Sequence, residues 1–147
     1  MYSDILTSIK TINDKRELEI ALRQAQPSFN QPGVDVVKVV DQFIPIKFAK
    51  KLNFETFKDT DPEKYFLGLL TEIDNLEIIN LTIAIDPTQQ LIDTICEWLG
   101  KNLSQAPIVD FLVDARIGAG VKIEYKGKYE DLSAQSKIET FTNDKSI

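Results

Sequence analysis

The chain has 147 residues, 43% of them hydrophobic, which is enough for one domain with a core or a small domain with a helical extension. Its 17 basic and 23 acidic residues give a net charge of -6, the wrong sign for a protein that neutralises nucleic-acid phosphates. Because the sequence contains no histidine, Ser-His-Asp and Cys-His catalysis and imidazole metal ligands are excluded.

The first twenty residues have scattered charges and no long apolar run, so we expect neither a signal peptide nor a membrane span there. A membrane would then be reached only through a partner. The single cysteine, Cys96, cannot form an internal disulfide, and we interpret it as a small buried hydrophobe in a reducing compartment.

The first 75 residues are predicted to be mainly helical. A first helix is indicated by apolar residues at helical spacing: Ile5, Ile9 and Ile12. A second is indicated by Leu18, Ala21, Leu22 and Ala25. This second helix should end by Pro27, because proline disrupts a helix interior.

The sequence pattern does not decide whether residues 34–52 form a strand or a helix. Their valines favour a strand, while the spacing of Val36, Val40 and Phe43 suits a helix. Pro45 would interrupt either one. A clearer helix follows, with Asp61 or Thr60 as its cap and Pro62 in its first turn. Its buried stripe should be Phe66, Leu69, Leu70 and Ile73.

The C-terminal half begins with a predicted strand over residues 76–85, which places Ile79, Leu81, Ile83 and Ile85 on one face. A helix should follow, with Asp86 as N-cap, Pro87 in its first turn and Gln89 completing a capping box. Gly100 is expected to stop it. Its apolar stripe, interpreted as core, is Leu91, Ile92, Ile95, Cys96, Trp98 and Leu99.

Two further alternating segments, residues 108–115 and 119–125, predict strands, and a tight turn at 126–127 leads to a short return over 128–131. Asp131 or Ser133 would then cap a last helix over 134–141, with Ile138 and Phe141 facing inward. The order strand-helix-strand-strand-helix after a helical region predicts an α+β protein. We place the boundary near residue 75, giving a helical region over residues 1–75 and an α+β domain over residues 76–147.

Five carboxylates are candidates for a site that binds magnesium or calcium: Asp110, Asp114, Glu124, Glu130 and Asp131. We interpret them instead as solvated charges, and we expect no cofactor. The glycines at 118 and 120 fit no phosphate-binding motif. They are typical of a bend, which would let the helix with Trp98 lie against the sheet.

The segment from Val109 to Glu139 resembles the C-terminal signature of the delta subunit of F-type ATP synthases, the family of the oligomycin-sensitivity-conferring protein. That signature is an acid, an aliphatic residue, a glycine pair, an alternating strand and a D-x-S. The matching positions are Asp114, Ile117, Gly120, Val121, Ile123, Asp131 and Ser133. Gly118 also belongs to the motif segment, but it occupies a position that is usually aliphatic in the family. Ala119 stands where the first glycine of the pair is expected. The resemblance covers about residues 77–141.

This resemblance implies a non-catalytic subunit of the peripheral stalk, or stator, of a proton- or ion-translocating ATP synthase. Its partners would be the alpha subunits and the b subunit, on the cytoplasmic or equivalent face of an energy-transducing membrane. Residues 1–75 would form a shortened version of the family's helical bundle. Candidates for its partner-binding groove, or for its core, are Ile5, Ile9, Leu18 and Leu22.

Two alternatives remain. One is an E-like stator subunit of a V- or A-type ATPase, which would need a long N-terminal helix that Pro27, Pro32 and Pro45 disfavour. The other is a small acidic domain that binds a metal or a ligand.

Overall fold

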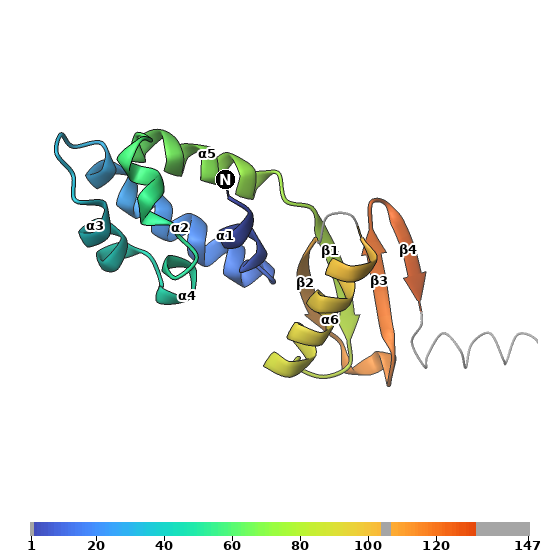
Figure 1. Ribbon diagram of the computed structural model, residues 1–147. Helices are drawn as coiled ribbons and strands as arrows, with labels where there is room; N and C mark the ends of the chain where they lie inside the picture. The colour runs from blue at the N-terminus through green and yellow to red at the C-terminus, as the bar shows by residue number, and fades with distance from the viewer. Residues whose placement is uncertain (1, 104–106, 132–147) are drawn as a thin grey trace, which may run out of the picture. The chain divides into compact units, whose positions relative to one another are not determined.

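The computed structural model describes residues 2–103 and 107–131. The chain divides into two compact units, Met1–Leu76 and Glu77–Ile147 (Figure 1). Helices form the first unit, and a sheet with one α-helix and one short 3₁₀-helix forms the described portion of the second, so the predicted α+β class is confirmed. Over the described ranges, none of the helices is both long enough and apolar enough to cross a membrane.

The described portion of the N-terminal unit contains five α-helices and one 3₁₀-helix. They are α1 (Ser3–Thr7), α2 (Ile12–Phe29), α3 (Val36–Phe43), α4 (Ile46–Ala49), η1 (Phe54–Lys58) and α5 (Pro62–Asp74). α5 begins as predicted, because the Asp61 side chain accepts a hydrogen bond from the Glu63 backbone N–H and Pro62 occupies its first turn. Its predicted apolar stripe is buried.

The first helix is shorter than predicted, and Ile12 belongs to α2 instead. The Thr11 side chain accepts a hydrogen bond from the Asp14 backbone N–H, and the Asp14 carboxylate accepts one from the Thr11 N–H, both at 3.2 Å. This reciprocal capping box starts a new helix. Ile9 therefore lies buried in the connection between α1 and α2.

α2 continues through Pro27 to Phe29, so the prediction that it ends by Pro27 is wrong. The proline removes one backbone hydrogen bond near the end of the helix, where the loss interrupts little. Phe29 holds the last turn in place, because its buried ring stacks on Phe66 with the ring centroids 4.1 Å apart.

Residues 34–52 are helical where they are regular, as α3 and α4. The Asp35 side chain caps α3 by accepting a hydrogen bond from the Lys38 backbone N–H at 3.3 Å. Pro45 separates the two helices, which confirms the prediction that it would interrupt a regular element here. Burial of Val40 and Phe48 in the core outweighs the strand preference of the valines.

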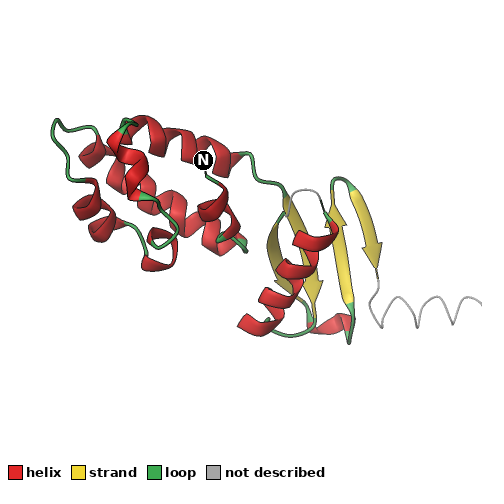
Figure 2. Cartoon of the chain, viewed as in Figure 1, coloured by secondary structure: helices red, strands yellow, loops and turns green. Residues whose placement is uncertain are grey.

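The C-terminal unit carries a four-stranded sheet in the order β2-β1-β3-β4 (Figure 2). Its elements are β1 (Ile78–Ile83), α6 (Gln89–Asn102), β2 (Ile108–Val113), the 3₁₀-helix η2 (Ala115–Ile117), β3 (Val121–Tyr125) and β4 (Lys128–Asp131). β1 is parallel to β2, and the crossover between them contains α6. β3 is antiparallel to both β1 and β4, so Leu81 of β1 lies between Phe111 and Ile123.

α6 differs from its prediction at both ends. Thr88, and not Asp86, is the N-cap, since its hydroxyl accepts a hydrogen bond from the Leu91 backbone N–H at 3.1 Å. Gly100 does not stop the helix, which runs on to Asn102. Gly100 is also absent from the glycines with positive φ, the conformation in which glycine ends a helix.

The predicted tight turn at 126–127 is confirmed. Lys126 has a φ of 53° and Gly127 a φ of 76°, as a two-residue turn of type I′ requires. The short return is β4, whose last residue, Asp131, pairs with Lys122. Ser133 and the helix predicted over 134–141, with Ile138 and Phe141, lie outside the described residues.

Candidate functional site

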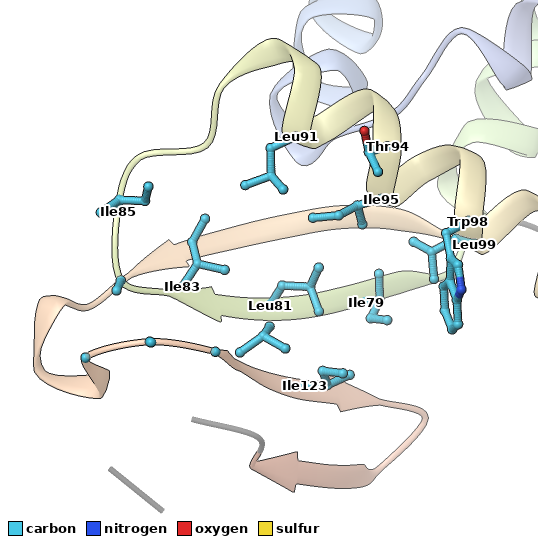
Figure 3. Close-up of a pocket in the computed structure, with 15 residues that line it drawn as sticks. Ile79, Leu81, Ile83, Ile85, Leu91, Thr94, Ile95, Trp98, Leu99 and Ile123 are labelled. Atoms are coloured by element: carbon cyan, nitrogen blue, oxygen red, sulfur yellow. The ribbon is translucent and has the colours of Figure 1, made fainter. Parts of the chain in front are cut away.

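An apolar groove of about 650 Å³ lies between α6 and the sheet in the C-terminal unit (Figure 3). Thr94 supplies the one hydroxyl among its lining side chains, which are otherwise aliphatic or aromatic. From the strands come Ile79, Leu81, Ile83, Val121 and Ile123, from the segment just after β1 come Ala84 and Ile85, and from the helix come Leu91, Ile95, Trp98 and Leu99. The backbone of residues 118–120 completes the rim.

Strand alternation creates the floor of this groove. Ile79, Leu81 and Ile83 project from one face of β1 and are buried. The antiparallel register places Leu81 opposite Ile123 and Ile83 opposite Val121, so β3 extends the same apolar face. Ile85, predicted to continue this face, lies beyond the end of the strand and is exposed at the end of the groove.

α6 covers only part of the sheet. Leu99 is 3% exposed and packs in a cluster with Ile79, Leu81 and Val109 of β2. Trp98, one residue earlier, is 60% exposed and lines the groove, so its interpretation as a core residue is wrong. The groove wall includes residues of β1 and β3 but none of β2 among those described. The side of α6 that faces β3 is therefore left open.

The rim at residues 118–120 is a tight backbone turn. Gly118 has φ 75° and ψ -68°, and the Ala119 N–H donates to the Ile117 carbonyl at 2.9 Å, which is the geometry of a γ-turn. Gly120 also has a positive φ, of 83°. Ile117, 1% exposed, anchors the turn. Both glycines border the same open groove as Trp98.

Asp114 has its charge satisfied by a neighbour. Its Oδ1 accepts hydrogen bonds from the backbone N–H and the Nε–H of Arg116, at 3.0 and 2.9 Å, and its Oδ2 accepts one from Nη2 at 2.9 Å. These bonds to the guanidinium lower the pKa of the Asp114 carboxyl to about 2. The acid of the family motif thus caps η2, which leads into the glycine turn.

Glu77, at the start of the C-terminal unit, is tied to the β3–β4 hairpin, a contact that the sequence did not reveal. The Tyr125 hydroxyl donates a hydrogen bond to Glu77 Oε2, and Lys126 Nζ lies 3.2 Å from Glu77 Oε1. The hydrogen bond from Tyr125, and then that from Lys126, lowers the pKa of the Glu77 carboxyl. The sequence held one indication of this contact, namely the tyrosine next to the predicted tight turn at 126–127.

The acidic residues weighed as candidate cation ligands, and interpreted as solvated charges, are not grouped as a metal site in the described ranges. Asp110 of β2 and Glu124 of β3 both pair with Asn80, on opposite sides of it, and Asp131 lies 3.7 Å from Lys122 Nζ. Over residues 2–103 and 107–131, no three His, Cys, Asp or Glu side chains are grouped as a metal site would require. The apolar groove is accordingly suited to an apolar side chain or helix face and offers no array of charges to an ion.

The N-terminal residues singled out from the sequence all lie in the interior of their unit. Ile5, Ile9, Leu18 and Leu22 are each buried. α1 and α2 carry three of them, and the connection between these helices carries Ile9.

Comparison with known proteins identifies two relatives, and no family model matches. ATP synthase subunit delta of Thermosipho melanesiensis is 23% identical over 108 residues, which cover 72% of this chain and 58% of that protein. ATP synthase subunit delta of Thermosipho africanus is 26% identical over 68 residues, 46% of this chain and 37% of that protein. The chain spans less than two thirds of the length of either relative. The resemblance to ATP synthase delta subunits is thus supported by whole-sequence comparison as well as by the motif.

Proposed function

We propose that this chain is a non-catalytic subunit of an F-type ATP synthase and acts in its peripheral stalk. It would link the alpha subunits of the catalytic head to the b subunit, so that the head does not turn with the rotor during ion translocation. It would lie on the cytoplasmic or equivalent face of the membrane and reach that membrane only through the complex.

The observation that carries this proposal is the extent of the similarity. The 108 residues matched to the delta subunit of Thermosipho melanesiensis are more than either unit contains, so the match extends over portions of both. A shared sheet motif alone would support only a common small fold. Similarity that includes the helical unit supports the same combination of two units.

The physical features of the described residues are compatible with a connector. Asp114 and Glu77, the acids with lowered pKa values, form hydrogen bonds or ion pairs with neighbouring side chains. The groove is apolar, and an apolar groove binds the apolar face of a helix more readily than a charged substrate. A subunit that resists torque needs such protein contacts and no chemistry of its own.

We infer that the helical unit faces the alpha subunits, as a shortened bundle, and that the sheet unit is the stator-type domain that faces the b subunit. Ile5, Ile9, Leu18 and Leu22 are buried. In this proposal they support the head-binding surface from the core of the helical unit.

The test is to recover the partners of the tagged full chain after gentle extraction of membranes from the source cells. Recovery of ATP synthase alpha and b subunits, followed by a stable complex of the purified proteins, would support the proposal. Recovery of V- or A-type stalk subunits would contradict it and favour the E-like alternative. A thermal midpoint that rises with millimolar magnesium would instead favour the metal-binding alternative, because a ligand specific for the native state stabilises it.

A further inference from the structure

β2 is the first strand in the sheet order β2-β1-β3-β4, so it forms one edge of the sheet (Figure 1). In its parallel pairing with β1, the Asp114 N–H donates to the Ile83 carbonyl at 2.8 Å. Successive residues of a strand turn their N–H and C=O groups to opposite sides, so every second residue from 108 to 114 bonds to β1. The N–H and C=O groups of Phe111 and Val113 therefore point out of the sheet edge.

We propose that this edge pairs in antiparallel orientation with β2 of a second copy of the chain, which joins the two sheets into one. The pairing is centred on Leu112. Phe111 then lies opposite Val113 of the second copy, and Leu112 lies opposite the second copy's Leu112. This inference concerns the chain alone and does not rest on its membership of an ATP synthase.

Burial along β2 sets the centre of this pairing. Val109, the earlier residue whose backbone groups face the edge, is 0% exposed, so it is not accessible to another strand. Leu112 and Val113 are 63% and 42% exposed, and Phe111 is partly buried. In an antiparallel sheet, two opposed residues whose groups face each other exchange both N–H···O bonds. Centring the pair on Leu112 therefore satisfies the accessible edge groups of Phe111 and Val113 in both copies.

The two edges of the sheet differ in how well they resist such pairing. Three of the four residues of β4 are charged, and charged side chains protect an edge from pairing with another chain. β2 has one charged residue, Asp110, among its six. A mainly apolar edge with unpaired backbone groups is a template for a further strand. The edge at β2 is therefore the one that we expect to associate.

The charges around Leu112 are complementary in this register. Asp110 and Asp114 share the face of Leu112, and Asp110 of each copy comes opposite Asp114 of the other. Two opposed carboxylates alone would repel each other. Arg116 binds Asp114 through Nε and Nη2, which leaves Nη1 to donate to the second copy's Asp110. The side chain of Arg116 is 86% exposed, so a second copy can reach it.

The pairing is self-complementary and closes at two copies, because a two-fold axis uses the β2 edge of each copy once. A contact along residues 110–114 is smaller than a standard protein interface. We therefore expect a dimer that forms at high protein concentration and dissociates on dilution.

Amide hydrogen exchange distinguishes the two sides of β2 residue by residue. In a dilute sample of the full chain, the amides of Phe111 and Val113 should exchange quickly, while the Leu112 amide, which bonds to β1, stays protected. In a concentrated sample, where sedimentation velocity detects the dimer, all three amides should be protected. A chain that stays monomeric at every concentration would overturn the proposal. A dimer in which Phe111 and Val113 exchange as quickly as in the monomer would also overturn it.

A proline at Val113 removes the outward N–H without removing a hydrogen bond to β1. The matched control is Val113→Ala, which shortens the side chain but keeps this N–H. Sedimentation velocity should show the dimer for the unmodified chain and for Val113→Ala, and a monomer for Val113→Pro. Equal dimer formation by the proline and alanine variants would contradict pairing through this edge.

A cross-link between the two Leu112 positions keeps the proposal testable if Val113→Pro fails to fold. In a Cys96→Ala background, Leu112→Cys places two thiols opposite each other, where the Cα atoms of a pair without hydrogen bonds lie about 4.5 Å apart. The matched control is Tyr129→Cys in the same background, because Tyr129 is also 63% exposed and lies on the other edge strand. Under mild oxidation, Leu112→Cys should form the disulfide-linked dimer faster. Equal rates for the two variants would overturn the proposal.

Discussion

The Tyr125 hydroxyl donates a hydrogen bond to the carboxylate of Glu77, 48 positions earlier in the chain. This contact joins the start of β1 to the turn of the β3–β4 hairpin, and Lys126 completes it with an ion pair to the same carboxylate. Because both partners favour the ionised form, the folded protein holds the pKa of Glu77 below its ordinary value of 4.5.

The first prediction is that Tyr125→Phe raises the pKa of Glu77 toward 4.5 without restoring it fully, because Lys126 remains. A carboxyl whose pKa is lowered by folding stabilises the native state above its unfolded pKa. That stabilisation is lost as the pH falls from about 4.5 through the lower folded value. NMR titration of the Glu77 side chain would measure the pKa, and denaturant unfolding across this pH window would measure the loss.

Tyr129→Phe is the matched control for this change, because it removes a hydroxyl from an exposed ring on β4. It should leave the Glu77 titration unchanged. An unchanged titration in Tyr125→Phe would mean that the hydrogen bond does not persist in solution.

A second prediction concerns Asp114, whose pKa is lowered from 3.8 to about 2 by Arg116. Arg116→Gln should return this pKa most of the way to 3.8, because it removes the charged side-chain donors and leaves the backbone N–H bond. The wild-type contribution to stability is full above pH 3.8 and disappears as the pH falls toward 2. NMR titration of the carboxyl carbon of Asp114 would measure its pKa in the wild-type protein and in the variant.

Arg16→Gln makes the same change of charge in the other unit, on α2. If it shifted the Asp114 pKa as much as Arg116→Gln does, the cause would be the net charge of the chain and not the paired guanidinium.

Local patterns in the sequence predicted most of the elements, because alternation in β1 and β3 and the Asp61–Pro62 start of α5 depend on neighbouring residues. Cap positions were predicted poorly where two residues competed. Thr88, and not Asp86, caps α6, and the Thr11–Asp14 capping box moves Ile12 from the expected first helix into the second. Each of these choices depends on where the helix axis must point to pack, which a local pattern does not contain.

The groove itself could not be predicted from the apolar stripe of α6. The sequence showed that Trp98 and Leu99 are both apolar, but it did not show that the helix packs through Leu99 and leaves Trp98 60% exposed. That difference depends on where α6 crosses the sheet. The Glu77–Tyr125 contact was missed for a similar reason, since only the sheet register brings its residues together.

A third prediction tests the core of the helical unit. Leu69→Ala should lower the free energy of unfolding of this unit by about 2–5 kcal/mol, because it leaves a cavity at a side chain that is 0% exposed. Leu67→Ala makes the same chemical change on the same helix at a side chain that is 40% exposed. Leu67→Ala should lower the free energy of unfolding by well under half as much as Leu69→Ala. Thermal or denaturant unfolding followed by circular dichroism at a helical band would compare them, and equal losses would contradict the described burial.

The fourth prediction compares the effects on stability of replacing two glycines of the C-terminal unit by alanine. Gly118→Ala should destabilise this unit by about 1–3 kcal/mol, because an L side chain is strained at the γ-turn dihedral angles of φ 75° and ψ -68°. Gly100→Ala should stabilise it by about 0.5–1 kcal/mol, because alanine is the better residue inside a helix and no atom lies within 4 Å of the added Cβ.

The opposite signs of these two effects make the comparison informative, since both variants add the same single methyl group. Denaturant unfolding monitored by Trp98 fluorescence reports on this unit, which carries the one tryptophan of the chain. If Gly100→Ala destabilised the unit instead, Gly100 would be the left-handed stop that the sequence indicated, and α6 would end before Lys101. If Gly118→Ala left the stability unchanged, the turn at the groove rim would not need a residue of positive φ, and the shape of the rim would have another cause.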